Sequence, residues 1–384
     1  MASYLWGMNK LEQGIGILGG GQLGRMFLQE SYNYNARVSV LDPAADAPCH
    51  ALAPHFVQGD FSDYETVLAF GRAQDVITVE FEHVNVEALH TLEKEGKKVY
   101  PQPAVLELIK DKGAQKAFYT ANGIPTGAYF LVENAAELKA QNLRFPLFQK
   151  LRKGGYDGYG VKPLRNIEDL EQAFDEPSLV EETVDFEKEL SVIVARNASG
   201  GVAVYPAVEM VFHPVANMVE FLASPAKISA ETEQKAQEIA RNVITALDMV
   251  GILAVEMFLT RTGQILVNEV APRPHNSGHQ TIEGNYCSQY EMHFRSICDL
   301  PLGNTGIIQP SVMVNLLGEP GYTGPALYKG LEEVMALPGV YVHLYGKTQT
   351  KPYRKMGHVT ILDADPEQAM LKAKRVKELL KVVS

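Results

Sequence analysis

The sequence predicts an α/β protein that opens with a doubly wound parallel sheet, becomes α+β in its central region and ends in a small β-rich part. Short apolar runs alternate with amphipathic segments at the start of the chain. Further on, paired apolar runs are joined by short turns, as in antiparallel strands. At 384 residues the chain is long enough for two or three domains with substantial cores.

The first part of the chain is predicted from its alternating elements. Residues 14–21 are typical of a buried strand that ends in a glycine turn, and residues 22–34 follow as an amphipathic helix. The alternation continues with strands and helices at 37–43, 64–71, 75–83, 86–95 and 98–103. This order predicts a parallel sheet that helices cover on both faces.

The remaining elements are predicted from apolar spacing. A helix near 110–122 precedes a β-rich segment, and the helix at 230–247 carries a stripe of apolar residues at helical spacing. Its acidic first turn, Glu231 and Glu233, complements the helix dipole. The last part predicts antiparallel strands and a closing helix, at 310–318, 339–347, 355–363 and 365–383.

Composition excludes several classes of function. The formal net charge is −11 and no basic tract exists, which argues against non-specific nucleic-acid binding. No apolar run is long enough to predict a membrane span. Cys49, Cys287 and Cys298 lack the spacing of a disulfide framework or a zinc site, so we expect reduced thiols in a cytoplasmic protein.

A glycine turn follows the first predicted strand. Gly19–Gly24 satisfies the pattern G-x-G-x-x-G before a helix, and Asp42 ends the second strand about twenty residues on. Glycines at a helix N-terminus let a phosphate approach backbone N–H groups. Two other interpretations stay open at this point: a tight turn without a ligand, and a dinucleotide-binding dehydrogenase.

Two carboxylates form the strongest pair in the chain. Glu256 and Glu269 lie in apolar runs joined by the turn at 260–263, so a hairpin would place them side by side with Asn268. Two buried carboxylates repel unless a cation intervenes, which predicts a hard-cation site suited to Mg²⁺ and phosphate oxygens. A solvated acidic pair is the alternative. A dense polar loop, 272–279, follows directly, where an anionic substrate would meet the metal-bound phosphate.

Two weaker signals lie upstream. Residues 153–160 hold four glycines in eight positions between strand-like flanks, which predicts a flexible tip that folds over phosphates, with Lys150 as a point charge. An ordinary hairpin is the alternative. Glu181–Val184 and Glu189 would serve a purine edge and ribose hydroxyls, against the alternative of surface acidic residues.

Taken in order, these motifs resemble the ATP-grasp superfamily. Within it the chain is similar to the 5-(carboxyamino)imidazole ribonucleotide synthase family, on the motifs GGGQLGRM, EFEHV, GGYDG and NEVAPRPHNSGH. One position departs, because Tyr159 stands where that family usually has Arg or Lys. The resemblance implies a pre-ATP-grasp domain, a split ATP-grasp domain with a lid subdomain, and a C-terminal domain, at 1–112, 113–303 (lid about 113–185) and 304–384.

The resemblance also implies the site residues. Mg²⁺, or Mn²⁺ in its place, would sit on Glu256 and Glu269. The nucleotide site would contain Lys112, Lys150, Gly155, Tyr156, Asp157, Gly158, Tyr159, Gly160, Val161, Glu181, Glu182, Thr183, Val184, Glu189, His213, Asn268 and Glu269. Aminoimidazole ribonucleotide would contact Gln22, Leu23, Glu80, Tyr156, Arg273, His275, Asn276, Ser277, Lys347 and Arg354.

The implied reaction is carboxylation of the ribonucleotide's exocyclic amine with ATP and bicarbonate, through carboxyphosphate, in purine biosynthesis. Arg273 and the following loop would hold carboxyphosphate, and either His275 or Asp157 would take the amine proton. The resemblance further implies a homodimer that passes its product to a separate mutase. A formate-dependent ATP-grasp ligase and a non-catalytic ATP-binding regulator are the remaining alternatives.

Overall fold

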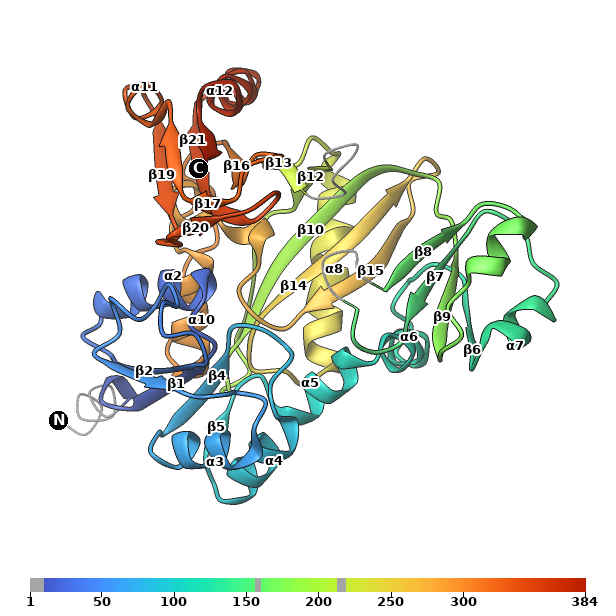
Figure 1. Ribbon diagram of the computed structural model, residues 1–384, viewed down its shortest axis with the longest axis horizontal. Helices are drawn as coiled ribbons and strands as arrows, with labels where there is room; N and C mark the ends of the chain where they lie inside the picture. Colours follow the sequence, from blue (N-terminus) through green and yellow to red (C-terminus); the bar gives the residue numbers. More distant parts are fainter. Residues whose placement is uncertain (1–9, 156–159, 213–218) are drawn as a thin grey trace.

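The structure is a computed structural model that describes residues 10–155, 160–212 and 219–384. Figure 1 shows an N-terminal α/β unit, a separate small sheet at the right, and a long central sheet that runs up into the C-terminal elements. No helix in these described ranges is long and apolar enough to cross a membrane.

The N-terminal unit confirms the doubly wound prediction. Its sheet is parallel, in the order β3-β2-β1-β4-β5, with the bounds β1 Gly14–Leu18, β2 Arg37–Asp42, β3 His55–Gln58, β4 Val76–Val79 and β5 Lys98–Val99. Its helices are α2 Gln22–Tyr32, α3 Tyr64–Arg72 and α4 Val86–Lys94. The predicted strand at 75–83 is too long, because the chain leaves the sheet after Val79 to form a loop.

The helix predicted near 110–122 is confirmed as α6 Lys112–Ala121. A second helix, α5 Pro103–Lys110, comes directly before it and was not predicted. Asp111 separates them because its backbone is extended and its carboxylate caps α6 by accepting from the N–H groups of Gly113 and Ala114. Pro103 starts α5 at a position where its missing N–H costs nothing.

The small sheet is antiparallel, in the order β6-β9-β7-β8. Its strands are β6 Tyr129–Val132, β7 Leu147–Leu151, β8 Val161–Leu164 and β9 Ser178–Glu182, with helix α7 Ala135–Lys139 and the 3-10 helix η1 Ile167–Gln172. β7 and β8 pair as a hairpin, so the glycine-rich segment does join two strands as predicted. We call this unit the lid sheet.

The central sheet follows the order β15-β14-β10-β12-β13-β16-β21-β19, with β11 beside β10. Helix α8 packs on one face of its central strands through apolar side chains such as Val192, Val243 and Val255. The bounds are β10 Phe186–Arg196, β11 Val202–Val204, β12 Val208–Phe212, β13 Val219–Ser224, α8 Ala230–Ala246, β14 Gly251–Thr260 and β15 Ile265–Ala271.

The segment after β15 joins the N-terminal unit to the central sheet. It holds η2 Asn276–Gly278, α9 Thr281–Gly284 and α10 Gln289–Ile297, none of which the sequence predicted. Helix α10 contacts α2 as well as β10 and β14. Phe294 of α10 packs into the same core as Phe27 of α2, so this helix fixes the first unit against the sheet.

The C-terminal strands are antiparallel as predicted, but they continue the central sheet through β13 and β16 (Figure 1). The predicted closing helix ends early, because Val382 and Val383 are buried in a final short strand instead. The bounds are β16 Ser311–Leu317, β17 Gly324–Pro325, β18 Leu327–Lys329, α11 Leu331–Met335, β19 Val340–Leu344, β20 Gln349–Thr350, β21 Lys355–Leu362, α12 Pro366–Leu379 and β22 Lys381–Val383.

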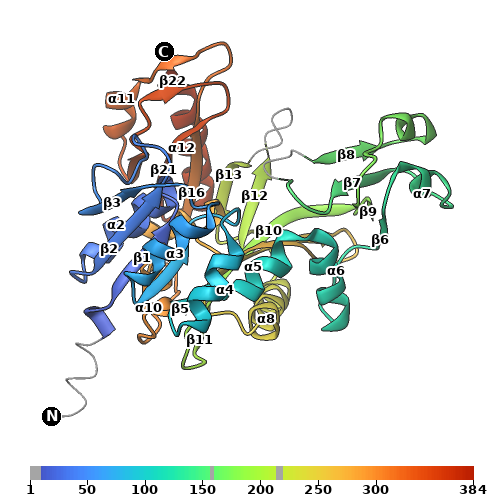
Figure 2. The same cartoon turned by 60° about the horizontal axis from the view of Figure 1, so that its bottom comes forward.

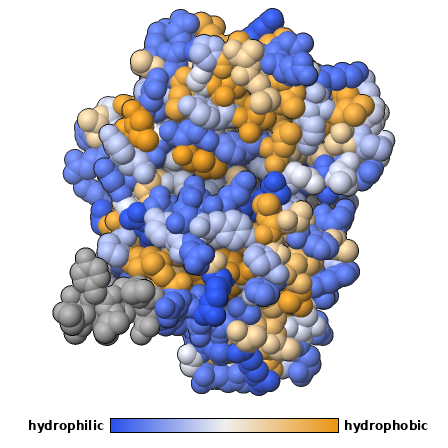
Figure 3. Space-filling model, turned by 90° about the vertical axis from the view of Figure 1, so that its left-hand side faces the viewer, coloured by the Kyte–Doolittle hydropathy of each residue, from blue (hydrophilic) through white to orange (hydrophobic). Residues whose placement is uncertain are grey.

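Two further views show the outer form of the molecule. In Figure 2 the lid sheet projects away from the rest of the chain and the C-terminal elements stand over the N-terminal sheet. Figure 3 shows the face formed by the N-terminal and C-terminal parts of the chain. Apolar side chains gather in its upper part, over the C-terminal elements.

Candidate active site

The predicted carboxylate pair lies across β14 and β15. Glu256 is directly opposite Glu269, and the register then shifts so that Met257 faces Val267. Asn268 is therefore the extra residue of a β-bulge, which re-aims side chains next to the irregularity. Asn268 and Glu269 are neighbours in one strand, yet each side chain contacts a lysine: Lys150 for Asn268 and Lys112 for Glu269. The turn chemistry predicted the pairing, and the bulge was not foreseen.

The lysines meet this pair from two elements. Lys112 Nζ, at the start of α6, lies 2.9 Å from Glu269 Oε2. Lys150 Nζ, in β7 of the lid sheet, lies 3.4 Å from Asn268 Oδ1. Two cations and two carboxylates thus converge where the lid sheet and the central sheet face each other.

The two carboxylates have opposite electrostatic states. Lys112 holds the pKa of Glu269 well below its usual range, against the effect of burial. Burial, together with the charge of Glu269, holds the pKa of Glu256 well above its usual range. A divalent cation would remove this repulsion, so the donor set fits a hard cation.

The side chain of Glu181 lies between two lysines. Its Oε2 lies 2.5 Å from Lys150 Nζ and its Oε1 lies 2.7 Å from Lys116 Nζ. The pKa of Glu181 stays below its usual value because the two lysines outweigh burial. Lys116 was missed, because the local sequence gives no sign that a lysine in a helix is buried.

The linker after β9 is more open than Glu181. Glu182 and Thr183 are exposed and Val184 is half-buried. Thr183 Oγ1 donates to the carbonyl of Pro146, 3.0 Å away, which ties the linker to the lid sheet. Glu189 follows in β10, and burial raises its pKa to about 7 although Lys150 opposes the shift.

The polar loop after β15 lies between Glu256 and the N-terminal unit. Arg273 Nε lies 3.0 Å from Glu82 Oε1, a partner that the sequence did not predict. His275 Nε2 lies 3.5 Å from Glu256 Oε1. Its Nδ1 accepts from the backbone N–H of Ser277 at 3.3 Å, so the ring proton belongs on Nε2.

The hydrogen bonds of the loop restrict what it can do. Burial and the charge of Arg273 lower the pKa of His275 to about 3, which makes this imidazole a poor base in the absence of substrate. Ser277, a predicted substrate contact, is buried, and its Oγ lies 2.7 Å from Ser191 Oγ and 2.9 Å from His275 Nδ1. It therefore supports the histidine.

Asn276 is held by the C-terminal part of the chain. Its side-chain amide donates to Asn315 Oδ1 at 2.8 Å and accepts from Asn315 Nδ2 at 2.9 Å. Asn315 lies in β16 and also donates to the carbonyl of Val219. His279, at the end of η2, is buried, and its ring centroid lies 4.7 Å from that of His358 of β21. The loop is thus braced against two strands that the sequence did not connect with it.

The glycine turn before α2 is occupied by the protein itself. Asp42 accepts from the N–H of Gly20 at 2.7 Å, and Glu80 accepts from Gly21 and Gly24 at 2.8 and 2.5 Å. These donors are the ones that a dinucleotide pyrophosphate would need. The turn therefore argues against the dehydrogenase interpretation. Burial raises the pKa of Glu80 to about 7.

Basic side chains of the C-terminal part lie beside this turn. Burial, reinforced by Arg354, lowers the pKa of Lys347 to about 8, while Glu80 opposes the shift. Lys347 donates to the carbonyl of Lys355 at 2.8 Å. Gly346 lies beside Arg25 of α2, since a Cβ added there would be in van der Waals contact with Arg25 Nη1, at 3.5 Å. Gln22 and Leu23 are half-buried in the same turn of α2.

Five residues of the predicted nucleotide site lie outside the described residues. Four belong to the glycine-rich segment, Tyr156, Asp157, Gly158 and Tyr159, and the fifth is His213. The described ends of the glycine-rich segment lie close together. Gly160 has a φ of +77°, and a Cβ there would lie 3.2 Å from Gly155 Cα. Glycine is required at this close crossing just before Val161.

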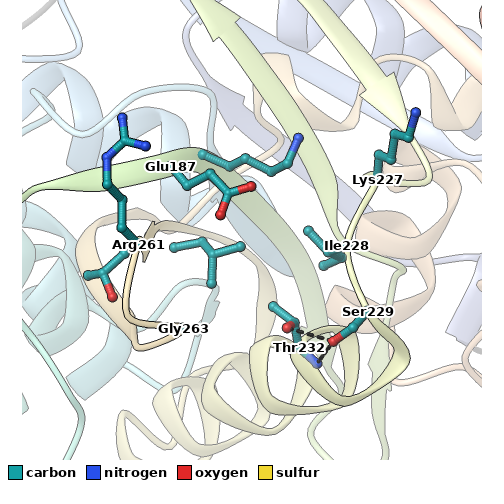
Figure 4. A pocket seen from close by; sticks show the side chains of 10 residues that line it. Glu187, Lys227, Ile228, Ser229, Thr232, Arg261 and Gly263 are labelled. Atoms are coloured by element: carbon teal, nitrogen blue, oxygen red, sulfur yellow. Dashed lines mark hydrogen bonds between the residues drawn. The ribbon is translucent and has the colours of Figure 1, made fainter.

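A different groove, of about 380 Å³, lies beside the start of α8 and the turn between β14 and β15 (Figure 4). Its lining includes Lys188, Ser229 and Arg261 but none of the predicted site residues. Within the described ranges, no group of three or more His, Cys, Asp or Glu side chains is arranged to hold a metal ion. A Mg²⁺ ion on two carboxylates would complete its shell with phosphate and water.

The central sheet, the lid sheet above it and the lysine–carboxylate group between them define an ATP-grasp protein. Three family models match in chain order. They are the ribonucleotide synthetase preATP-grasp domain at residues 12–110, the ATP-grasp domain at 117–290, and the phosphoribosylaminoimidazole carboxylase C-terminal domain at 311–372.

Curated relatives and solved structures narrow this class. The N5-carboxyaminoimidazole ribonucleotide synthase of Bacillus subtilis is 38% identical over 356 residues, which cover 91% of each chain. A synthetase structure from Thermotoga maritima is 46% identical with a TM-score of 0.90, over 97% of this chain and 99% of that one. The chain belongs to the N5-carboxyaminoimidazole ribonucleotide synthase family. This is the family that the sequence motifs indicated under the name 5-(carboxyamino)imidazole ribonucleotide synthase.

Two other relatives add context. The chloroplastic phosphoribosylaminoimidazole carboxylase of Vigna aconitifolia is 38% identical over 357 residues, and this chain spans 64% of its length. A synthase structure from Aspergillus clavatus in complex with ADP and 5-aminoimidazole ribonucleotide is 33% identical, with a TM-score of 0.88 over 96% of this chain and 98% of that one.

Proposed function

We propose that this protein uses ATP and bicarbonate to carboxylate the exocyclic amine of 5-aminoimidazole ribonucleotide in purine biosynthesis, through carboxyphosphate. One observation carries the proposal. Glu269, near the end of β15 and beside the lysines, is followed within a few residues by Arg273, in the loop beside the N-terminal unit. A phosphate held at Glu269 and an acceptor held at Arg273 would therefore meet at the loop.

We propose that Mg²⁺, or Mn²⁺ in its place, binds Glu256 and Glu269 with Asn268 beside them. The fit rests on the carboxylate pair, because burial and then the charge of Glu269 raise the pKa of Glu256. A bound ion would neutralise charge that develops on the transferred phosphoryl group. Lys112 and Lys150 supply fixed positive charge at the same place.

The loop residues would hold carboxyphosphate and keep water from it. Arg273 offers a guanidinium fork to an anion, and Glu82 fixes the orientation of that side chain. His275, whose Nδ1 already accepts a hydrogen bond, is placed to donate from Nε2. We therefore favour Asp157 as the proton acceptor for the amine. Lys347 and Arg354 would bind the 5-phosphate beside Gln22 and Leu23.

Incorporation of labelled bicarbonate tests this proposal. The protein, ATP and aminoimidazole ribonucleotide are incubated with ¹³C-bicarbonate, and the product is trapped and analysed by NMR. We expect the label on the exocyclic nitrogen, with formate inactive as a replacement for bicarbonate. Label in no product, or turnover with formate, would contradict the assignment.

We further propose the domain boundaries near residues 112 and 303, a homodimer, and transfer of the product to a separate mutase. The family models at 12–110, 117–290 and 311–372 support the boundaries. Exposed apolar side chains on the C-terminal elements support an interface: Tyr322, Leu327, Met335 and Tyr341. Light scattering on the purified protein tests the dimer.

A further inference from the structure

Lys116 is a buried lysine with no role in the chemistry described so far. Only 3% of its surface is exposed. Its Nζ lies 2.7 Å from Glu181 Oε1 and donates to Thr126 Oγ1 at 2.6 Å. A buried ammonium is costly unless it is paired, so this position needs a reason.

The partners of Lys116 belong to both halves of the nucleotide site. Glu181 ends β9 of the lid sheet, and its other oxygen lies 2.5 Å from Lys150. Thr126 donates onward to the carbonyl of Val267 at 2.7 Å, in β15 just before Asn268. The ammonium group of Lys116 therefore contacts β9, which pairs with the strand of Lys150. Through Thr126 it is also linked to β15, which carries Glu269.

Helix α6 ties the two carboxylates to one rigid element. Lys112 and Lys116 are four residues apart in this helix, so their side chains lie on the same face. Lys112 reaches Glu269 while Lys116 reaches Glu181. Glu269 and Glu181 thus each have a lysine of α6 that partly neutralises them.

The charge balance gives Lys116 a consequence for ligand binding. Glu181 carries one negative charge and lies between two ammonium groups, so the three side chains together carry one positive charge. Without Lys116 the remaining pair would be neutral. Glu181 would then pair with Lys150 alone, and in a site of low dielectric constant this ion pair would hold Lys150 strongly.

We propose that Lys116 is a positioning residue that neutralises Glu181, so that the charge of Lys150 is available to the phosphates of a nucleoside di- or triphosphate. This inference rests on the proposed function, since it assumes that Lys150 meets those phosphates. Lys116 touches no substrate in this account. It acts through Glu181 alone.

A purely structural role makes a different prediction. If Lys116 only fastened the lid sheet to the central sheet, removing Glu181 as well would add a second loss. If Lys116 acts by neutralising Glu181, removing Glu181 releases Lys150 and reverses the defect. The double variant therefore separates the two roles.

The test is the affinity for ADP with Mg²⁺, measured by isothermal titration calorimetry on the full chain. We expect Lys116→Met to weaken ADP binding about tenfold or more, because the favourable charge is lost. Lys116→Arg keeps the charge, and we expect it to bind within about threefold of the wild type. The variant Lys116→Met/Glu181→Gln should recover to within about threefold of the wild type as well.

Lys372→Met is the matched control, because Lys372 Nζ lies 2.7 Å from Asp363 Oδ2 in the C-terminal part and far from the lysine–carboxylate group. It should leave ADP affinity unchanged. Should Lys116→Met alone be too unstable to assay, the double variant decides, since it leaves Glu181 uncharged: a tenfold loss there overturns the inference.

The outcomes separate this inference from the proposed function. A wild type that does not bind ADP overturns the proposed function, and the inference falls with it. A folded Lys116→Met variant with wild-type affinity overturns the inference alone. So does a double variant that binds ADP more weakly than Lys116→Met.

Discussion

Glu256 and Glu269 face each other across β14 and β15, and Lys112 pairs with Glu269 while burial and the charge of Glu269 raise the pKa of Glu256. We expect Glu269→Ala to lower bicarbonate-dependent ADP formation by about 10²–10³-fold, because a charge-stabilising group is lost from the site. Steady-state ADP release measures this. Glu171→Ala, which removes an exposed lid carboxylate, should be normal. Wild-type turnover in Glu269→Ala would show that the metal assignment is wrong.

We expect the affinity for the ribonucleotide to depend on pH through Lys347. Burial lowers its pKa to about 8, so the ammonium is charged below that pH and neutral above it. Affinity for the 5-phosphate should be constant from pH 6.5 to 7.5 and should fall up to about tenfold per unit above pH 8. The KM for the ribonucleotide across this range measures it. Lys347→Arg should keep a flat profile to higher pH, and an identical profile in both proteins would refute the assignment.

Glu80 predicts a contribution to stability. Its carboxylate is half-buried and accepts from two backbone N–H groups at the start of α2. Glu80→Ala leaves these donors without a partner, so we expect the free energy of unfolding to fall by about 1–3 kcal/mol. Urea denaturation followed by circular dichroism measures the change. An unchanged midpoint would mean that water replaces the carboxylate without cost.

We expect Asn315 to help couple the cleavage of ATP to the carboxylation of the ribonucleotide. Its reciprocal hydrogen bonds hold Asn276, and with it the loop that would bind carboxyphosphate. We expect Asn315→Ala to keep ADP release within about threefold while the product formed per ADP falls, because a loosened loop admits water. Parallel assays of ADP and carboxylated product give this ratio. An unchanged ratio would remove Asn315 from the account.

Periodicity and motif order predicted much of the fold, because those signals are local. The parallel sheet of the first unit and the pairing of Glu256 with Glu269 follow from alternation and a short turn. Helix α5 was missed because it is short and a single capping residue, Asp111, separates it from α6. The continuity of β13 with β16 was missed because strands distant in sequence give no pairing signal.

The site was predicted less completely than the fold. Motifs indicated Lys112, Lys150 and the loop, but side-chain partners across domains leave no pattern in one sequence. Glu82 beside Arg273 and Lys116 beside Glu181 are examples, since both pairs join elements far apart in the chain. The two ion pairs of the Glu181 side chain with Lys116 and Lys150 were not predicted either.

The central claim is that one site couples ATP cleavage to carboxylation of a ribonucleotide. ADP release with ATP, bicarbonate and aminoimidazole ribonucleotide, with each omitted in turn, tests it most directly. We predict full ADP release only when all three are present, and a large loss when either bicarbonate or the ribonucleotide is left out. ADP release that is indifferent to both, or none with the complete mixture, would contradict the account.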